Sequence, residues 1–231
     1  MFSSTSAERK DDRIALVAER RLVGQAVEAA LRARELDPVL FAWPRHGALG
    51  VFRAGLDRSA ARVGVILCAL DSPDLLHDVE VVVGRGPVRW LVLTDSREGP
   101  RWGAVLEAGA TAVLPTSTTT AGLVLAIRET RAGRPPMNKM ARARAIRQWH
   151  EVAQEQHVLI RRMEQLTRRE FEILGHLYDG WSVSRISAAA GVSESTVRSQ
   201  VKSLRRKLGV HSQLAAVAAY RRSLEVFPRY R

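Results

Sequence analysis

Short apolar runs alternate with amphipathic stretches between residues 13 and 132. The longest run, residues 63–70, is almost continuously apolar, which is typical of a strand buried on both faces of a parallel sheet. Residues 22–31 and 123–131 instead repeat apolar positions at helical spacing. This alternation predicts an α/β fold, a five-stranded doubly wound parallel sheet covered by helices. The five predicted strands are residues 13–17, 39–43, 63–70, 88–94 and 112–114.

Residues 166–224 carry a helical pattern only, and we expect a separate all-α, four-helix domain there. A short helix over residues 183–190 is followed by Gly191, where a positive φ is easy only for glycine. Ser193 then caps a longer helix that ends at Gly209. This order predicts a helix-turn-helix, whose second helix enters the DNA major groove. The two flanking helices are predicted from a capping box of Thr167 and Glu170 onward and over residues 213–222.

The helix that follows Ser193 has two different faces. One face repeats apolar residues at spacings of four, three and four, which predicts burial against the other helices. The other face is cationic, and Arg and Lys side chains read guanine in the major groove. The helix N-terminus, at Ser193 to Thr196, carries free N–H groups that suit a phosphate. The apolar face consists of Val197, Val201, Leu204 and Leu208, and the cationic face of Arg198, Ser199, Lys202, Arg205 and Arg206.

The formal net charge of +12 belongs entirely to the C-terminal part of the chain. Basic and acidic residues number 16 each up to residue 130. Residues 131–160 hold 6 basic and 2 acidic residues, and residues 161–231 hold 14 and 6. A positive field localised in this way favours a polyanion, here double-stranded DNA, as the partner.

The DNA-binding domain of LuxR/NarL-type transcriptional regulators closely resembles one segment of this chain, LTRREFEILGHLYDGWSVSRISAAAGVSESTVRSQVKSLRRKLGVHSQLAAVAA. The resemblance implies a regulator that binds DNA as a homodimer, with contact to RNA polymerase as a further candidate. It places base reading at Arg198, Ser199 and Lys202, and backbone contacts at Ser193, Thr196, Gln200, Arg205 and Arg206. It also implies a contact between two such domains at Leu214, Val217 and Ala218, for which core packing is the alternative.

Beside such a domain, the five βα units resemble the receiver domain of response regulators. The resemblance is carried by Thr94 at a predicted strand end, by AGA at residues 108–110 and by AVLP at residues 112–115. A working receiver needs an acidic pair for Mg²⁺, an aspartate that accepts phosphate, and a lysine. The resemblance places Ala18 and Glu19 at the acidic pair, Ala69 at the phosphoacceptor and Thr116 at the lysine.

Three of those four positions lack the functional group, so we expect an atypical receiver that does not depend on phosphorylation. Asp71, two residues past Ala69, is the nearest carboxylate, but it lacks the metal pair and the lysine. Constitutive dimerisation, a small ligand and a partner protein stay open as roles for this domain. A ligand would bind at the carboxyl edge of the sheet, the usual place in this architecture.

A linker over residues 133–165 is predicted to join the two domains, which span residues 13–132 and 166–224. It begins with GRPPMNKM, whose paired prolines end the preceding helix. Apolar positions then recur in a short heptad pattern, which favours a long helix packed on its twin or on a domain; a free-standing helix is the alternative. Arg142, Arg144 and Arg147 are candidates for contacts to DNA phosphates.

Other classes of protein fit the sequence poorly. A nucleophile–base pair and a metal-ligand cluster are both missing, so we expect neither an enzyme nor a cofactor. The sequence has no run long enough to span a membrane, its start lacks the apolar core of a signal peptide, and Cys68 is its single cysteine, which together predict a cytoplasmic protein. Residues 1–12 are predicted to be disordered, and residues 225–231 to form a tail.

Two other functions are weighed against a DNA-binding regulator. A sigma-factor-like subunit of RNA polymerase would share the helix-turn-helix but would need an all-helical partner domain, which the α/β pattern of residues 13–132 excludes. The second is an interaction protein whose receiver-like domain sequesters a partner, with DNA binding secondary. A comparison of its affinities for specific and random DNA would separate that role from a regulator's.

Overall fold

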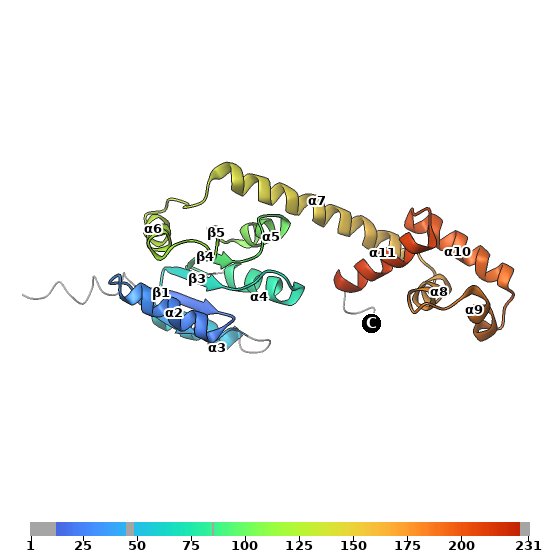
Figure 1. Cartoon of the computed structure of the whole chain (residues 1–231), viewed down its shortest axis with the longest axis horizontal. Coiled ribbons are helices and arrows are strands. Elements are labelled where there is room, and N and C mark those ends of the chain that lie inside the picture. Colours follow the sequence, from blue (N-terminus) through green and yellow to red (C-terminus); the bar gives the residue numbers. More distant parts are fainter. Residues whose placement is uncertain (1–12, 45–48, 85, 227–231) are drawn as a thin grey trace, which may run out of the picture. The chain divides into compact units, whose positions relative to one another are not determined.

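The computed structural model describes residues 13–44, 49–84 and 86–226 (Figure 1). The disorder predicted for residues 1–12 therefore lies outside the described residues. The chain divides into two compact units between His150 and Glu151. We call them the α/β unit and the helical unit, and describe each by itself.

The α/β unit contains a five-stranded sheet in which every neighbouring pair of strands is parallel. The strand order is β2-β1-β3-β4-β5, so the chain reverses its direction of travel across the sheet between β1 and β3. This confirms the predicted doubly wound fold. The strands are β1 (Arg13–Ala18), β2 (Asp37–Phe41), β3 (Val63–Leu67), β4 (Arg89–Thr94) and β5 (Ala112–Pro115).

Helices cover both faces of this sheet, because crossovers of one hand that run in opposite directions from its middle lie on opposite faces. α2 packs beside α6, and α4 packs beside α5. The helices are α2 (Arg21–Arg32), α3 (Leu49–Ser59), α4 (Pro73–Val83), α5 (Pro100–Ala108) and α6 (Thr120–Arg131).

Two predicted strands differ from the observed ones. β2 begins at Asp37 rather than residue 39, and it includes Pro38 in its ladder with β1. Proline is accepted there because β2 is an edge strand, whose outward side needs no N–H donor. β3 ends at Leu67, yet Cys68 and Leu70 beyond it are buried, so the apolar run was longer than the strand.

Close packing in the sheet depends on one large and one small side chain. Trp90 of β4 is almost fully buried, and its ring lies over Gly64 in the adjacent strand β3. A Cβ atom at residue 64 would come within 2.2 Å of that ring. Glycine is therefore required at this position to make room for the indole.

The long helix α7 (Lys139–Glu164) contributes to both units. Near its start, Ala145 is fully buried and its carbonyl lies so close to Gly103 that a Cβ there would be 2.1 Å away. Near its end, Met163 is 4% exposed and belongs to the core of the helical unit. α7 is therefore packed rather than free-standing. Its packing on a second copy of the chain stays a prediction.

Two arginines near the start of α7 have partners within the chain. The guanidinium of Arg142 donates to the carbonyls at the end of α5, those of Leu106, Ala110 and Thr111. Arg144 pairs with Glu98 at 2.5 Å. These contacts occupy the guanidinium groups of Arg142 and Arg144, which were expected to contact DNA phosphates. The structure does not support a phosphate contact for either residue.

The helical unit contains four helices after α7, as predicted: α8 (Arg168–Tyr178), α9 (Val183–Ala190), α10 (Glu194–Leu208) and α11 (Gln213–Val226). α11 continues four residues past its predicted end, so residues 225 and 226 belong to a helix and not to the predicted tail. The rest of that tail, residues 227–231, lies outside the described residues. The unit has its own apolar core, separate from the core of the α/β unit.

Candidate nucleic-acid interface

Local capping interactions position the two helices of the helix-turn-helix. The hydroxyl of Ser182 accepts a hydrogen bond from Arg185 N and caps α9, and that of Ser193 accepts from Thr196 N and caps α10. Between them, Gly191 is left-handed with φ 64°. The two serine hydroxyls accept hydrogen bonds from N–H groups that the start of a helix leaves without a partner, and the left-handed glycine turns the chain after α9. The sharp turn between α9 and α10 thus follows from the local sequence.

The apolar face of α10 is buried as predicted. Val197, Val201, Leu204 and Leu208 are each at most 8% exposed and contact the core formed with α8, α9 and α11. Because this face is fixed, the rotation of α10 about its axis is fixed too, and the opposite face is directed to the surface.

That opposite face carries the predicted DNA contacts. Arg198, Ser199, Lys202 and Arg206 are exposed. Arg198 forms an exposed ion pair with Glu194 of the preceding turn at 3.3 Å. Lys202 and Arg206 make no hydrogen bond or ion pair with the part of the chain that the structure describes. A shallow hollow on this face is lined by Val183, Arg198, Val201, Lys202, Arg205, Arg206, Val210, His211 and Gln213.

Three of the residues predicted to contact the DNA backbone are partly buried or already hydrogen-bonded within the chain. Arg205 is half-buried and donates to the carbonyl of His211. Gln200 is half-buried. The hydroxyl of Thr196 is hydrogen-bonded to that of Ser193 at 2.8 Å, although both residues are exposed at the N-terminus of α10. Ser193 and Thr196 thus lie where the helix presents its unpaired N–H groups.

A buried ion pair supports α10 from behind. The carboxylate of Glu170 in α8 accepts from Lys207 Nζ of α10 at 2.6 Å, and its side chain is only 3% exposed. It also accepts from the backbone N–H of Thr167, which completes the predicted capping box. Burial alone would raise the pKa of Glu170, but the hydrogen bonds from Lys207 and Thr167 outweigh it and lower the pKa to about 2.

The three residues predicted to form a contact between two such domains differ in their exposure. Leu214 at the start of α11 is 78% exposed, and Ala218, one turn later, is exposed as well. Val217 is half-buried and packs on the core of its own unit. Leu214 therefore does not serve the core, and Val217 does.

Sequence reasoning missed two features of this unit. The guanidinium of Arg162 in α7 donates to the carbonyl of Leu208 at the end of α10, at 3.0 Å. Trp181 lies stacked on His176 and under the guanidinium of Arg185, 4.0 Å from the ring centroid. The spacing of four between Trp181 and Arg185 could have indicated the second contact, but no local signal pairs Arg162 with a carbonyl 46 residues away.

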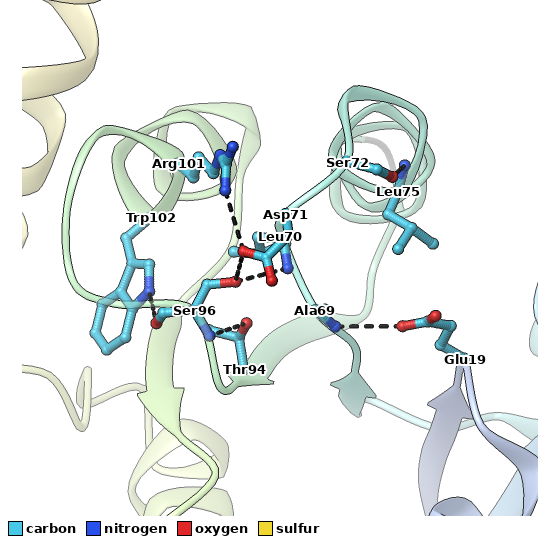
Figure 2. A network of polar contacts seen from close by, with 10 residues as sticks. All are labelled: Glu19, Ala69, Leu70, Asp71, Ser72, Leu75, Thr94, Ser96, Arg101 and Trp102. Carbon is cyan, nitrogen blue, oxygen red and sulfur yellow. Dashed lines mark hydrogen bonds and ion pairs between the residues drawn. The ribbon is translucent and has the colours of Figure 1, made fainter.

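The carboxyl edge of the sheet, where a receiver holds its phosphoacceptor, contains a closed polar network (Figure 2). Ala69, which the resemblance to a receiver places at the acceptor position, donates its N–H to Glu19 at 3.3 Å. The carboxylate of Asp71 accepts from Ser96 Oγ at 2.9 Å and from Arg101 at 3.0 Å. Ser96 Oγ accepts in turn from the N–H of Leu70. Asp71 therefore has partners within the chain and lies beside the loop after β4.

The remaining positions of this edge are also occupied by ordinary structural contacts. Thr94 is fully buried and its hydroxyl accepts from Ser96 N at 3.2 Å. Thr116 is exposed, and its N–H donates to the carbonyl of Thr94. Burial raises the pKa of the Cys68 thiol to about 12, helped by the nearby carboxylates of Glu19 and Asp95, which keeps that sulfur protonated and unreactive.

Two kinds of feature are absent from the described ranges, residues 13–44, 49–84 and 86–226. No group of three or more His, Cys, Asp or Glu side chains in them could hold a metal ion. Likewise, no described helix is both long and apolar enough to cross a bilayer.

One segment of the chain matches a known family. Residues 164–219 match the model of the bacterial regulatory proteins of the luxR family. A probable transcriptional regulatory protein, SgaR of Hyphomicrobium methylovorum, is 43% identical over 58 residues, which make up 25% of this chain and 28% of SgaR. The predicted LuxR-type domain is thus confirmed for this segment, while the chain matches little more than a quarter of its curated relative.

Solved structures whose similarity extends over most of the chain have lower sequence identity to it. The RcsB response regulator of Salmonella typhimurium is 17% identical with a TM-score of 0.46, over 92% of this chain and 98% of that chain. The response regulator ChrA of a heme-sensing two-component system is 23% identical with a TM-score of 0.43, over 94% and 99%. RcsB has also been solved as a complex with DNA.

Proposed function

We propose that this protein is a sequence-specific DNA-binding transcriptional regulator, with α10 as the helix that reads base edges in the major groove. The observation that carries the proposal is the pair of faces on α10. Its apolar face is buried, and the opposite face directs Arg198, Lys202 and Arg206 to the surface. A helix held in this way, with cations on its free face, has the geometry that a major groove accepts.

The proposed contacts divide into two kinds. Arg198, Ser199 and Lys202, which lie in the middle part of α10, read bases. Residues at the helix ends contact phosphates, since the N–H groups at the start attract anions and the cations at the end add charge. This second group consists of Ser193, Thr196, Arg205 and Arg206 near the helix ends, together with Gln200, which lies in the middle of the helix and is half-buried. Arg205 would reach a phosphate only with the part of its guanidinium that His211 leaves free.

Two copies of the chain are proposed to bind together. Leu214 and Ala218 form a small exposed apolar surface one turn apart on α11, and such a surface is covered when two domains meet. Two helices that meet in this way read half-sites about one DNA turn apart. Val217 supports this surface from the core side.

The α/β unit is proposed to act without phosphorylation. Ala69 cannot accept a phosphoryl group, and the carboxylate of Asp71 is held by Ser96 and Arg101. The unit then serves for dimerisation or for binding a ligand or partner protein. Incubation with acetyl phosphate and Mg²⁺ should give no acid-labile adduct by intact mass, and a stoichiometric adduct would refute this part of the proposal.

Selection of bound duplexes from a random DNA pool tests the main proposal. We expect a two-fold symmetric sequence with half-sites about one turn apart, bound about 10³-fold or more tightly than random DNA. The matched control is the same chain with Lys202→Glu, which reverses one charge on the reading face. Equal affinity of the wild-type chain for selected and random DNA would favour an interaction protein, in which DNA binding is secondary.

A further inference from the structure

The end of α10 is closed in part by its own backbone. Gly209 is left-handed with φ 67°, and its N–H donates to the carbonyl of Arg206. The next N–H, that of Val210, donates to the carbonyl of Arg205 at 3.0 Å. This is the Schellman arrangement, which satisfies carbonyls of the last turn from within the chain. The carbonyl of Leu208, the last residue of the helix, receives neither of these bonds.

Arg162 of α7 provides the missing donor. Its guanidinium donates to Leu208 O at 3.0 Å and lies directly against Gly209. A Cβ atom at residue 209 would be 2.8 Å from Arg162 Nη1 and would displace the guanidinium, and the left-handed φ of 67° also favours glycine there. A cation at the C-terminus of a helix also opposes the partial negative charge of that end.

The same device occurs at the end of the other helix of the motif. Gly191 ends α9 in a left-handed conformation, and Arg169 of α8 donates to the carbonyl of Ala190 at 3.4 Å. Both helices of the helix-turn-helix are thus held at their C-terminal ends by arginines from helices outside the motif. The contact at α10 is the shorter of the two.

Arg162 is itself firmly placed. The next residue, Met163, is 4% exposed in the core that contains the apolar face of α10, and Leu159, one turn earlier, packs against the same core. These residues precede residue 164, where the match to the luxR family begins. The helical unit therefore includes a part of α7 that the family segment leaves out.

We propose that Arg162 is a positioning residue for DNA recognition, which holds the end of α10 so that its cationic face meets one register of base edges. This inference rests on the proposed function. Without the contact, the last turn of α10 is free to fray, and the residues that line the end of the hollow, Arg206, His211 and Gln213, change position. Arg162 acts through α10 and touches no base.

The test compares Arg162→Met with Arg161→Met in the full-length chain. Both substitutions remove one positive charge from the same turn of α7, but Arg161 makes no hydrogen bond or ion pair with any residue that the structure describes. We expect Arg162→Met to weaken binding to the selected sequence about 3- to 10-fold more than binding to random DNA, on which it should match Arg161→Met. Arg161→Met should lower both affinities slightly and equally. Equal losses on both DNAs for Arg162→Met would overturn the proposal.

Amide hydrogen exchange keeps the proposal testable if Arg162→Met unfolds the domain. Arg162→Lys retains the charge but replaces the planar guanidinium with a single flexible ammonium group. Exchange at residues 208–211 should be faster in Arg162→Lys than in Arg161→Lys, and equal exchange would contradict the proposed hold. Because this measurement needs no DNA, it separates a failure of this inference from a failure of the wild-type chain to select a sequence.

Discussion

The carboxyl edge of the sheet and the cationic face of α10 use charged side chains in opposite ways. At the edge, the carboxylate of Asp71 accepts from Ser96 and Arg101, and Glu19 accepts from a backbone N–H. On α10, Lys202 and Arg206 contact no partner among the described residues and lie exposed. Glu19 and Asp71 at the edge have partners within the molecule, whereas Lys202 and Arg206 on α10 are available to another molecule.

This difference distinguishes charged residues that stabilise the fold from charged residues that can bind another molecule. A charge that is already hydrogen-bonded gains little from a ligand, because binding must first break the internal contact. An exposed cation without a partner gains directly from a phosphate or a base edge and releases counterions from the DNA. The position of a charge relative to its neighbours, rather than the number of charges, therefore distinguishes a candidate binding surface from a closed structural network.

The largest effect should come from the buried support of α10. Glu170→Gln leaves the ammonium of Lys207, whose side chain is 26% exposed, without its counter-charge. We expect the free energy of unfolding of the helical unit to fall by about 2–4 kcal/mol, measured by urea titration followed by circular dichroism. The control Glu172→Gln lies in the same helix but is exposed, and it should leave the stability unchanged. A similar loss for both variants would show that burial of Glu170 is irrelevant.

The same carboxylate predicts how stability depends on pH. The pKa of Glu170 falls from 4.5 to about 2 on folding, so the unfolded chain binds more protons between these values. Its contribution, about 3 kcal/mol, is present above pH 4.5 and is lost as the pH falls toward 2. The difference in stability between the wild-type chain and Glu170→Gln should therefore shrink over this range. A constant difference would contradict the lowered pKa.

Removal of one exposed cation should act on binding and not on folding. Lys202→Ala should weaken binding to the selected DNA by about 1–3 kcal/mol and relax the preference for one base, while the melting temperature stays the same. Arg222→Ala, which removes an exposed cation from α11, is the control and should change the salt dependence only slightly. The affinities are measured by fluorescence anisotropy at two salt concentrations. Equal losses on selected and random DNA would remove Lys202 from the base-reading group.

The smallest effect should follow from a change at the closed network. Asp71→Asn keeps an oxygen that accepts from Ser96 and removes only the charge paired with Arg101. Both side chains of this pair are more than half exposed. We expect a change in the free energy of unfolding below about 1 kcal/mol and an unchanged affinity for DNA. A marked change in DNA affinity would show that this edge is a signalling site.

Local sequence rules predicted the helix caps and turns of the helical unit. The capping box of Thr167 and Glu170 and the left-handed glycines at residues 191 and 209 all occur as predicted. Each depends on contacts within about one helical turn, so the sequence carries the whole signal. The α/β unit was predicted in outline, but β2 began two residues early because its edge position, a tertiary property, admits Pro38.

The exposure of the candidate site residues could be predicted from the sequence only where it depends on the helical period. The buried face of α10 fixes which face is exposed, so the exposure of Arg198 and Lys202 followed from the helical period alone. Arg205 has the same residue type and a nearby position, yet it is half-buried and donates to His211. The exposure of Leu214 likewise depended on how α11 packs, which the sequence left open.

The sequence by itself determined the order of strands and helices and the turn between α9 and α10. The tertiary structure decided which arginines of the described ranges serve the fold and which face outward. Arg142 and Arg162 bind carbonyls at the ends of helices 31 to 46 residues away, whereas Arg206 faces outward. Periodicity and capping arise between neighbours in the chain, but the partner of a long cationic side chain is fixed only when distant segments pack together.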